Sequence, residues 1–179
     1  MAEKQILFAG FVGQGILFSG KYLAYKGLMD EKQVSWLPSY GPEMRGGTAN
    51  CSIMISDKEI SSPIVTRATA VIAMNRPSLE KFENTVVPGG KLFINSSIID
   101  IKSSRTDIDV YYVPCNEIAH ELGNDKVANI VMLGAYLEKC PVVSVDSLLQ
   151  ALLEKLGKNK AHLIPMNREA FLKGAEAVK

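Results

Sequence analysis

The stretch Gln5-Ile-Leu-Phe-Ala-Gly-Phe-Val-Gly-Gln-Gly15 decides the fold class of this 179-residue chain. Its first six residues form a short apolar run that ends in glycine, which predicts a buried strand. A glycine-rich turn follows, and the next stretch of about fifteen residues, reaching Met29, has the character of a helix. A strand that passes through a glycine turn into a helix is typical of Rossmann-like α/β domains.

Strand-like and helix-like segments alternate along the rest of the chain. Strands are expected at residues 34–37, 48–55, 70–74, 91–94 and 109–113, with Pro38 closing the second strand and Pro88-Gly-Gly90 forming a turn. Helices are expected at residues 78–85, 127–139 and 144–156, and a final helix is expected to be capped by Asn167. The sequence therefore predicts a single Rossmann-like α/β domain over residues 1–179, with a mostly parallel sheet flanked by helices.

The composition argues against several classes of protein. Twenty Lys+Arg against 19 Asp+Glu give a net charge of +1, so no general attraction to nucleic acid or anionic lipid is expected. No apolar run approaches the roughly 18 residues of a spanning helix, and the start Met1-Ala-Glu-Lys-Gln5 does not resemble a signal peptide. Cys51, Cys115 and Cys140 are too few and too scattered for a disulfide framework. We therefore expect a cytoplasmic protein with neither membrane nor nucleic-acid partners.

The turn that contains Gly10, Gly13 and Gly15 is the first candidate binding site. Backbone amides at the start of a helix attract a phosphate or another anion. The dinucleotide fingerprint requires a glycine where Val12 stands and an acid near the end of the second strand, where residues 36–39 provide none. NAD binding is therefore disfavoured, and a purely structural turn is the alternative to anion binding.

Residues 38–47, Pro-Ser-Tyr-Gly-Pro-Glu-Met-Arg-Gly-Gly, are the second candidate site. Two prolines and three glycines predict a loop, and a compact domain rarely keeps such a loop without a use for it. Arg45 beside Gly46 and Gly47 can present a fork of donors while the backbone approaches a ligand or a neighbouring chain. Tyr40 offers an amphipathic contact surface. The alternative is a rigid loop that only holds its own sheet.

Asparagines follow three of the predicted strands, at Asn75, Asn95 and Asn116. Because ligands of parallel sheets gather beyond the carboxyl ends of the strands, we expect these side chains to lie at one edge near the glycine turn. Neutral amides suit binding rather than proton transfer. Taken singly, each asparagine also fits a turn or a helix cap.

Residues that would make the chain a self-sufficient enzyme are missing from the sequence. His120 and His162 lie at no zinc-ligand spacing from a cysteine, and no Cys-x-x-Cys pattern exists for an iron–sulfur cluster. Cys51 lies among alternating strand residues, which favours a small buried side chain over a nucleophile. We therefore predict no catalytic residue, no metal ligand and no cofactor on this chain.

A long motif of the chain resembles the gamma subunit, or gamma domain, of 2-oxoacid:ferredoxin oxidoreductases. The motif is the string from Pro38 to Ser52, PSYGPEMRGGTANCS, preceded by Gly13-Gln-Gly15. The resemblance covers most of the chain and is strongest between residues 8 and 96, although the family usually has a further glycine where Val12 stands. The other matching residues, in the family's order, are Ser62-Pro63, Ala73-Met-Asn75, Pro88-Gly-Gly90 and Asn95.

The resemblance implies a subunit of a multisubunit enzyme that is not catalytic alone. Such complexes decarboxylate a 2-oxoacid with thiamine diphosphate and Mg, pass electrons through [4Fe-4S] clusters to ferredoxin, and transfer the acyl group to coenzyme A. The alpha and beta subunits are implied to hold the thiamine, and a ferredoxin-like delta subunit or beta to hold the clusters. The gamma subunit is implied to pack on these partners and to help form the coenzyme A region.

Seven residues are therefore our expected contacts to coenzyme A or to a partner subunit. Two alternatives stay open: a purely structural assembly subunit, favoured by Val12, and a free-standing nucleotide-binding redox protein, suggested by the strand–glycine–helix start. We expect the 2-oxoacid to be 2-oxoglutarate or a branched-chain oxoacid rather than pyruvate, with an indolepyruvate branch also open. The seven residues are Gly13, Gln14, Gly15, Tyr40, Arg45, Gly46 and Gly47.

Overall fold

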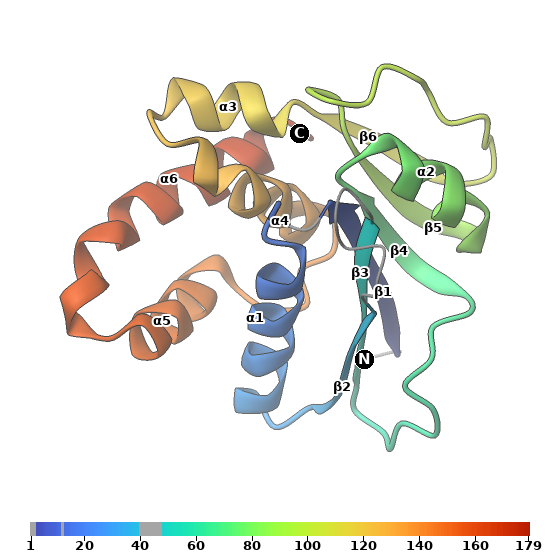
Figure 1. The fold of residues 1–179 in the computed structure, drawn as a ribbon. Coiled ribbons are helices and arrows are strands. Elements are labelled where there is room, and N and C mark those ends of the chain that lie inside the picture. Colours follow the sequence, from blue (N-terminus) through green and yellow to red (C-terminus); the bar gives the residue numbers. More distant parts are fainter. Residues whose placement is uncertain (1–2, 12, 40–47) are drawn as a thin grey trace.

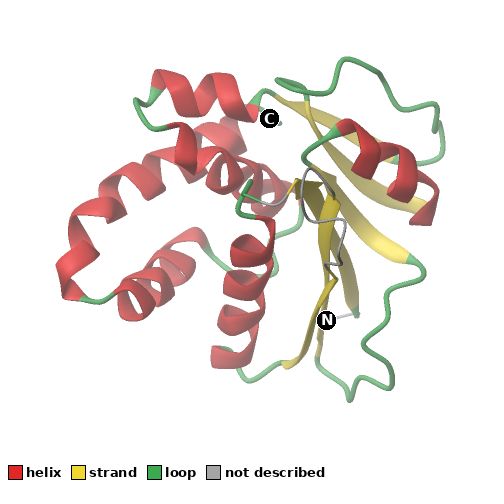
Figure 2. Ribbon diagram, viewed as in Figure 1, coloured by secondary structure: helices red, strands yellow, loops and turns green. Residues whose placement is uncertain are grey.

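The computed structural model describes residues 3–11, 13–39 and 48–179, and places six strands in one twisted sheet between two layers (Figures 1 and 2). The strands are β1 (Lys4–Phe11), β2 (Gln33–Ser39), β3 (Thr48–Ser56), β4 (Ala68–Ala73), β5 (Val86–Asn95) and β6 (Asp109–Val113). Their order in the sheet is β2-β3-β1-β4-β5-β6. Each predicted strand is present, and the predicted α/β class is confirmed.

The sheet is mostly parallel, as predicted, with one exception. β3 runs antiparallel to both of its neighbours, β1 and β2, whereas the pairs β1–β4, β4–β5 and β5–β6 are parallel. Ser39 pairs with Asn50, and Phe11 pairs with Thr48. The residues that flank positions 40–47 therefore lie at the same edge of the sheet as the carboxyl end of β1.

Helices cover the two faces of the sheet unequally. The helices are α1 (Ile16–Met29), α2 (Arg76–Phe82), α3 (Cys115–Glu121), α4 (Ala128–Lys139), α5 (Val145–Leu156) and α6 (Ile164–Glu176), with 3-10 turns η2 (Glu83–Thr85), η3 (Asp125–Val127) and η4 (Lys158–Leu163). Figure 1 shows α2 on one side of the sheet and the other helices on the opposite side. Within the described chain, none of these helices has the length and apolar character needed to cross a bilayer.

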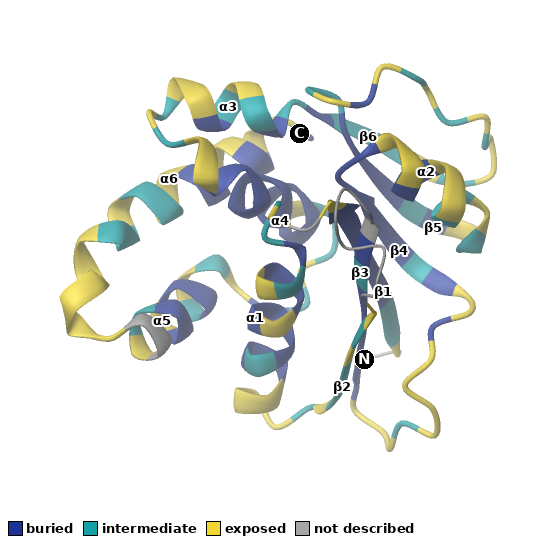
Figure 3. Cartoon of the chain, in the orientation of Figure 1, coloured by how far each residue is buried: buried dark blue, intermediate teal, exposed yellow. Residues whose placement is uncertain are grey.

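Each face of the sheet has its own hydrophobic core, as the buried residues in Figure 3 indicate. Along β1, Ile6 and Phe8 belong to the core under the larger group of helices, and Leu7 between them belongs to the core under α2. Successive side chains of a strand point to opposite faces, so an apolar run without polar interruptions serves both cores at once. This explains why β1 is a nearly continuous apolar run in the sequence.

Two predicted strand boundaries are wrong, and both involve proline. Pro38 does not close the second strand, because it pairs with Cys51 and β2 continues to Ser39. β2 is the edge strand, where a residue without an N–H is tolerated. The predicted turn at residues 88–90 lies inside β5, where the register with β4 shifts between Ala68 and Ala70. Gly89, with a φ of 80°, allows this irregularity.

The helical third of the chain also differs from expectation in two places. α3 was not predicted, because it has only seven residues and begins directly after Pro114 at the end of β6. α6 begins at Ile164 rather than after an Asn167 cap, since a proline in the first helical turn starts the helix earlier. Asn167 instead donates from Nδ2 to the Leu163 carbonyl, at 2.8 Å.

Candidate functional site

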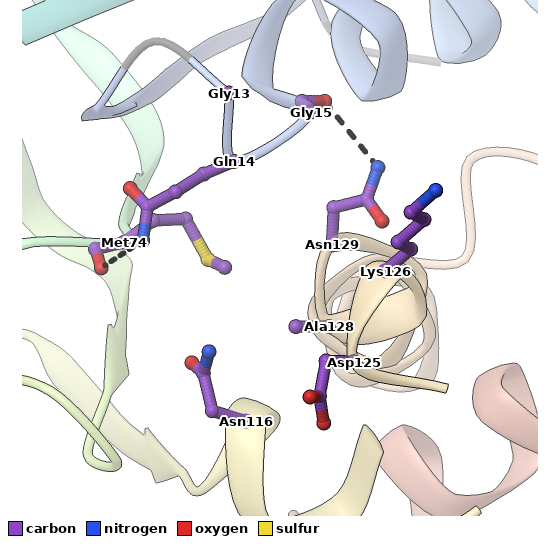
Figure 4. A pocket seen from close by; sticks show the side chains of 9 residues that line it. All are labelled: Gly13, Gln14, Gly15, Met74, Asn116, Asp125, Lys126, Ala128 and Asn129. Carbon is purple, nitrogen blue, oxygen red and sulfur yellow. Dashed lines mark hydrogen bonds between the residues drawn. The ribbon is translucent and has the colours of Figure 1, made fainter. Parts of the chain in front are cut away.

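A cavity of about 360 Å³ lies where the glycine turn after β1 faces the first turn of α4 (Figure 4). Its walls come from the carboxyl ends of β1 and β4 and from the segments that begin α1, α3 and α4. Open α/β sheets bind ligands at this edge. The lining residues are Gly13, Gln14, Gly15, Met74, Asn116, Asp125, Lys126, Ala128 and Asn129.

The glycine turn presents the start of a helix to the cavity. Gly13 and Gly15 have φ values of 99° and 74°, a left-handed backbone that glycine adopts without steric cost. Gly15 is the N-cap of α1 and has no side chain to cap the first amides, and the first turn of α1 contains no acidic residue. The positive end of the α1 dipole is therefore not neutralised by its own helix, which favours an anion at this wall.

The side chain of Gln14 stabilises the glycine turn by two hydrogen bonds to the backbone. Its Oε1 accepts a hydrogen bond from the Phe11 amide at 2.7 Å, and its Nε2 donates to the Met74 carbonyl at 3.2 Å. A Cβ at Gly10 would approach Gln14 Oε1 to 2.6 Å, so this glycine makes room for the amide. Gln14 thus ties the glycine turn to the end of β4, and only the remainder of its surface faces the cavity.

Asn75, Asn95 and Asn116 lie at this edge of the sheet, as predicted, but their side chains have different roles. Asn75 is completely buried and caps α2, its Oδ1 accepting from the Ser78 amide at 3.0 Å. Asn95, also buried, donates from Nδ2 to Asn116 Oδ1 at 2.8 Å. Of the three, Asn116 lines the cavity, because α3 carries it past the end of β6. The helix-cap alternative therefore holds for Asn75, and the binding-edge prediction fits Asn116.

Asp125, Lys126 and Asn129 line the cavity and were not predicted from the sequence. Asp125 and Lys126 belong to η3, and Asn129 lies in the first turn of α4. The Nδ1 atom of His120 lies 3.2 Å from Asp125 Oδ1, within hydrogen-bond distance. These residues follow α3, which brings the chain back to the glycine turn. Because α3 has only seven residues, the sequence shows no clear helical periodicity there, and the return of the chain could not be predicted.

The cysteines of the described chain take no part in this site. Burial raises the pKa of the Cys51 thiol to about 12. Cys51 is fully buried in the core, so the prediction of a small buried side chain is confirmed. Burial also raises the pKa of the Cys115 and Cys140 thiols. Among the residues that the structure describes, no three His, Cys, Asp or Glu side chains come together as metal ligands.

The structure brings together the first three of the seven predicted contact residues, Gly13, Gln14 and Gly15, in one cavity wall. The other four, at positions 40 and 45–47, lie outside the described residues. Their described neighbours Ser39 and Thr48 lie at the same sheet edge as this cavity's glycine turn.

The fold and the cavity together define a class of protein: an α/β domain whose first glycine turn opens a cavity at the carboxyl edge of a mostly parallel sheet. The family model for pyruvate ferredoxin/flavodoxin oxidoreductase matches residues 5–177. The chain belongs to this family, and the resemblance noted in the sequence is confirmed.

Two curated relatives differ in how much of their length the chain spans. It is 33% identical to the 2-oxoglutarate synthase subunit KorC of Methanocaldococcus jannaschii, over 99% of this chain and 95% of that protein. It is 33% identical to the ketoisovalerate oxidoreductase subunit VorA of Methanothermobacter thermautotrophicus, over 97% of this chain but 36% of VorA. The chain therefore spans about a third of VorA and nearly all of KorC.

Solved structures have the same fold, whether the match covers nearly all of the other chain or about a third of it. The gamma subunit of a keto/oxoacid ferredoxin oxidoreductase from Geobacter sulfurreducens has a TM-score of 0.81 and 29% identity, with 98% of each chain covered. A 2-oxoglutarate:ferredoxin oxidoreductase from Magnetococcus marinus, solved with 2-oxoglutarate, coenzyme A and succinyl-CoA bound, has a TM-score of 0.89 and 24% identity. That match covers 99% of this chain and 31% of the other, and shows the likeness of fold alone.

Proposed function

We propose that this chain is the gamma subunit of a 2-oxoacid:ferredoxin oxidoreductase, and that its cavity forms part of the coenzyme A region. The complex would decarboxylate a 2-oxoacid oxidatively, form an acyl-CoA and reduce ferredoxin. Thiamine diphosphate with Mg and the [4Fe-4S] clusters would be held by alpha, beta and ferredoxin-like delta partners. In this proposal, Gly13, Gln14, Gly15, Tyr40, Arg45, Gly46 and Gly47 contact coenzyme A or a partner subunit.

The observation that carries this proposal is the cavity wall formed by the start of α1. Coenzyme A is an anion because of its phosphates, and an uncapped helix start without acidic residues is a good place for a phosphate. Lys126 adds a cation to the lining, next to the carboxylate of Asp125. The Magnetococcus protein, solved with coenzyme A bound, shares this fold. Membership of the oxidoreductase family favours a subunit over a free-standing redox protein.

The relatives also support a choice of substrate. VorA is named for ketoisovalerate, a branched-chain oxoacid, and KorC for 2-oxoglutarate; a pyruvate synthase subunit, PorC of Methanocaldococcus jannaschii, is less similar, at 27% identity. We therefore propose one of these two substrate types for the complex. The choice between them would be made by the subunits that hold thiamine diphosphate.

Steady-state kinetics of the reconstituted complex tests the proposal. Lys126→Ala should raise the KM for coenzyme A about tenfold and leave the thiamine content unchanged, because one phosphate contact is lost. Lys158→Ala, an exposed lysine of η4, is the matched control and should leave the KM unchanged. Arg45→Ala should also raise the KM for coenzyme A.

A purely structural assembly subunit is the second candidate, and exposed apolar side chains favour it. Phe18 and Leu28 of α1 are 40% and 63% exposed, and Leu37 of β2 is 39% exposed. Side chains of this kind often lie at protein interfaces. If a coenzyme A photo-crosslinker labels only other chains, and Arg45→Ala dissociates the complex without changing the KM, the assembly role replaces the coenzyme A role.

A further inference from the structure

Asn95, at the end of β5, is a fully buried asparagine whose amide is held by backbone groups at both ends. Its Oδ1 accepts a hydrogen bond from the Ser97 amide at 3.3 Å, and its Nδ2 donates to the Met74 carbonyl at 3.4 Å. A backbone N–H can only donate and a backbone carbonyl can only accept. These two partners therefore fix which end of the Asn95 amide is oxygen and which is nitrogen.

The orientation of Asn95 determines the orientation of Asn116. Asn95 Nδ2 also donates to the Asn116 side chain, at 2.8 Å, and because Nδ2 is a donor, the atom that receives it is the acceptor Oδ1. The Asn116 backbone amide donates to Ser97 Oγ at 3.1 Å, which holds the start of α3 in place. Nδ2 is thus the end of the Asn116 amide that is left over, and no acceptor within the described chain is bonded to it.

The amide of Asn116 is accessible from the cavity. Asn116 is half-buried and belongs to the cavity lining, whereas Asn95 does not. Figure 4 shows the Asn116 side chain extending from α3 into the space that the lining residues surround. The Met74 carbonyl also accepts from Gln14 Nε2, at 3.2 Å, so one hydrogen-bond network joins the glycine turn to Asn116.

We infer that Asn95 is a positioning residue, which makes Asn116 a hydrogen-bond donor to the ligand of the cavity. This inference rests on the proposed function and deepens it. Asn95 has both ends of its amide engaged and acts only through Asn116. The group that Asn116 Nδ2 would bind is an acceptor without a proton. Coenzyme A has such acceptors in two places, the phosphate oxygens and the carbonyl oxygens of the pantetheine arm.

A double-mutant cycle tests whether the two asparagines act as one unit, with coenzyme A binding to the reconstituted complex measured by calorimetric titration. Asn116→Leu should weaken binding about tenfold, because the donor is lost. Asn95→Leu should weaken it about fivefold, because nothing then holds Asn116 with its nitrogen toward the ligand. The double variant should bind no more weakly than Asn116→Leu alone, since Asn95 has no effect once its partner is gone.

Asn75→Ser is the matched control. Asn75 is also a fully buried asparagine, at the end of the neighbouring strand β4, but it caps α2 and does not line the cavity. Serine is an equally good N-cap, so coenzyme A binding should change less than about twofold. If Asn95→Leu does not fold, Asn95→Asp takes its place in the cycle. Its carboxylate still accepts from the Ser97 amide but, when ionised, has no N–H for Asn116.

Fragments of coenzyme A distinguish the two sources of the acceptor. Adenosine bisphosphate has phosphates and no amide carbonyl, and pantetheine has amide carbonyls and no phosphate. If Asn116→Leu weakens the binding of adenosine bisphosphate to the complex, Nδ2 donates to a phosphate. If it weakens the binding of pantetheine instead, Nδ2 donates to a carbonyl. Either pattern supports the inference.

Three results would overturn it. If the double variant binds coenzyme A about fiftyfold more weakly than wild type, the two effects are independent and Asn95 does not act through Asn116. If both single variants bind like wild type while Lys126→Ala still raises the KM, the proposed function stands and the inference is wrong. If Lys126→Ala has no effect and crosslinking labels only other chains, the proposed function fails, and the inference that rests on it fails too.

Discussion

The start and the middle of helix α4 differ in what they contact: the start lines the cavity, and the middle packs against α6. At its start, Asn129 lines the cavity and keeps a buried side-chain oxygen without a hydrogen-bond partner in the described chain. One turn and a half further on, Gly134 lies against the backbone of α6, where an added Cβ would approach the Phe171 carbonyl oxygen to 2.2 Å. A helix start that lines a cavity can contact a ligand, whereas a helix middle in close contact with the backbone of another helix serves packing alone.

The α4–α6 contact is close because both helices contribute a glycine. A Cβ at Gly174 would approach the Val131 carbonyl oxygen to 1.8 Å. Helices usually pack with their axes 8–10 Å apart, depending on the side chains between them, and glycines allow the near end of this range. The contact holds α6 against the helix that supplies the cavity wall.

The largest effect is expected from Gly174→Ala. Alanine normally favours a helix over glycine by roughly 1 kcal/mol. Here the new methyl group meets backbone that cannot rotate away, and we expect a loss of about 3 kcal/mol or more in the free energy of unfolding. Urea denaturation of the purified chain measures it.

Gly27→Ala in α1 is the matched control for that experiment. The nearest atom to its added Cβ is a side-chain methyl carbon, Val34 Cγ2, at 3.0 Å, so the free energy of unfolding should change by less than about 1 kcal/mol. Equal urea midpoints for the two variants would show that the α4–α6 contact is not as rigid as the comparison requires.

Gly15→Ala should come next, at the other end of the comparison. Its φ of 74° is unfavourable for alanine, and the Cβ would approach Asn129 Nδ2 to 2.4 Å. We expect about 2 kcal/mol of destabilisation, together with weaker coenzyme A binding, because Asn129 must move.

Gly123→Ala separates the two contributions to that loss. Gly123 has a φ of 83° with no atom of the described chain within 4 Å of its Cβ position, so it incurs the backbone cost of about 1 kcal/mol alone. If Gly15→Ala is no worse than Gly123→Ala in thermal unfolding, Asn129 is not held against the glycine turn.

The comparison also shows what the sequence could and could not predict. Apolar runs such as residues 5–9 revealed the strands, because both faces of the sheet are covered and every side chain is buried or nearly so. The antiparallel placement of β3 between β1 and β2 left no mark on its composition. Strand order depends on pairings between distant segments, which local pattern does not encode.

Only part of the cavity lining could be predicted from the sequence, for a similar reason. Gly13 and Gly15 lie at a strand-to-helix turn, a pattern that is local and therefore visible. Asn129 lies in a helix that is buried almost all round, so periodicity did not show which side would face the glycine turn. Its role became apparent only when the partners of its Nδ2 were known.

A smaller effect on stability is expected from Asn129→Leu. The variant loses the bonds from Nδ2 to Gly15 and Ser19, which contribute roughly 0.5–1.5 kcal/mol each, but it also removes a buried acceptor without a partner. These terms oppose each other, so we expect the free energy of unfolding to stay within about 1 kcal/mol of wild type. Chemical denaturation checks it, and a loss of about 3 kcal/mol would assign Asn129 to the stabilising part of α4.

The smallest effect concerns Cys140, directly after the last turn of α4. Burial raises the pKa of its thiol, and the charges of Lys91 and Lys4 oppose that rise. Lys91→Met removes one opposing charge, so the pKa should rise further and the thiolate fraction at a given pH should fall. We expect native alkylation of Cys140 to slow about twofold near pH 8, measured by mass spectrometry, because Asp109 already offsets part of the Lys91 charge. Lys158→Met, in η4, is the control and should leave the rate unchanged. Faster alkylation in Lys91→Met would mean that the end of α4 opens when the charge is lost, and that rigidity does not extend from the Gly134 contact to the last turn.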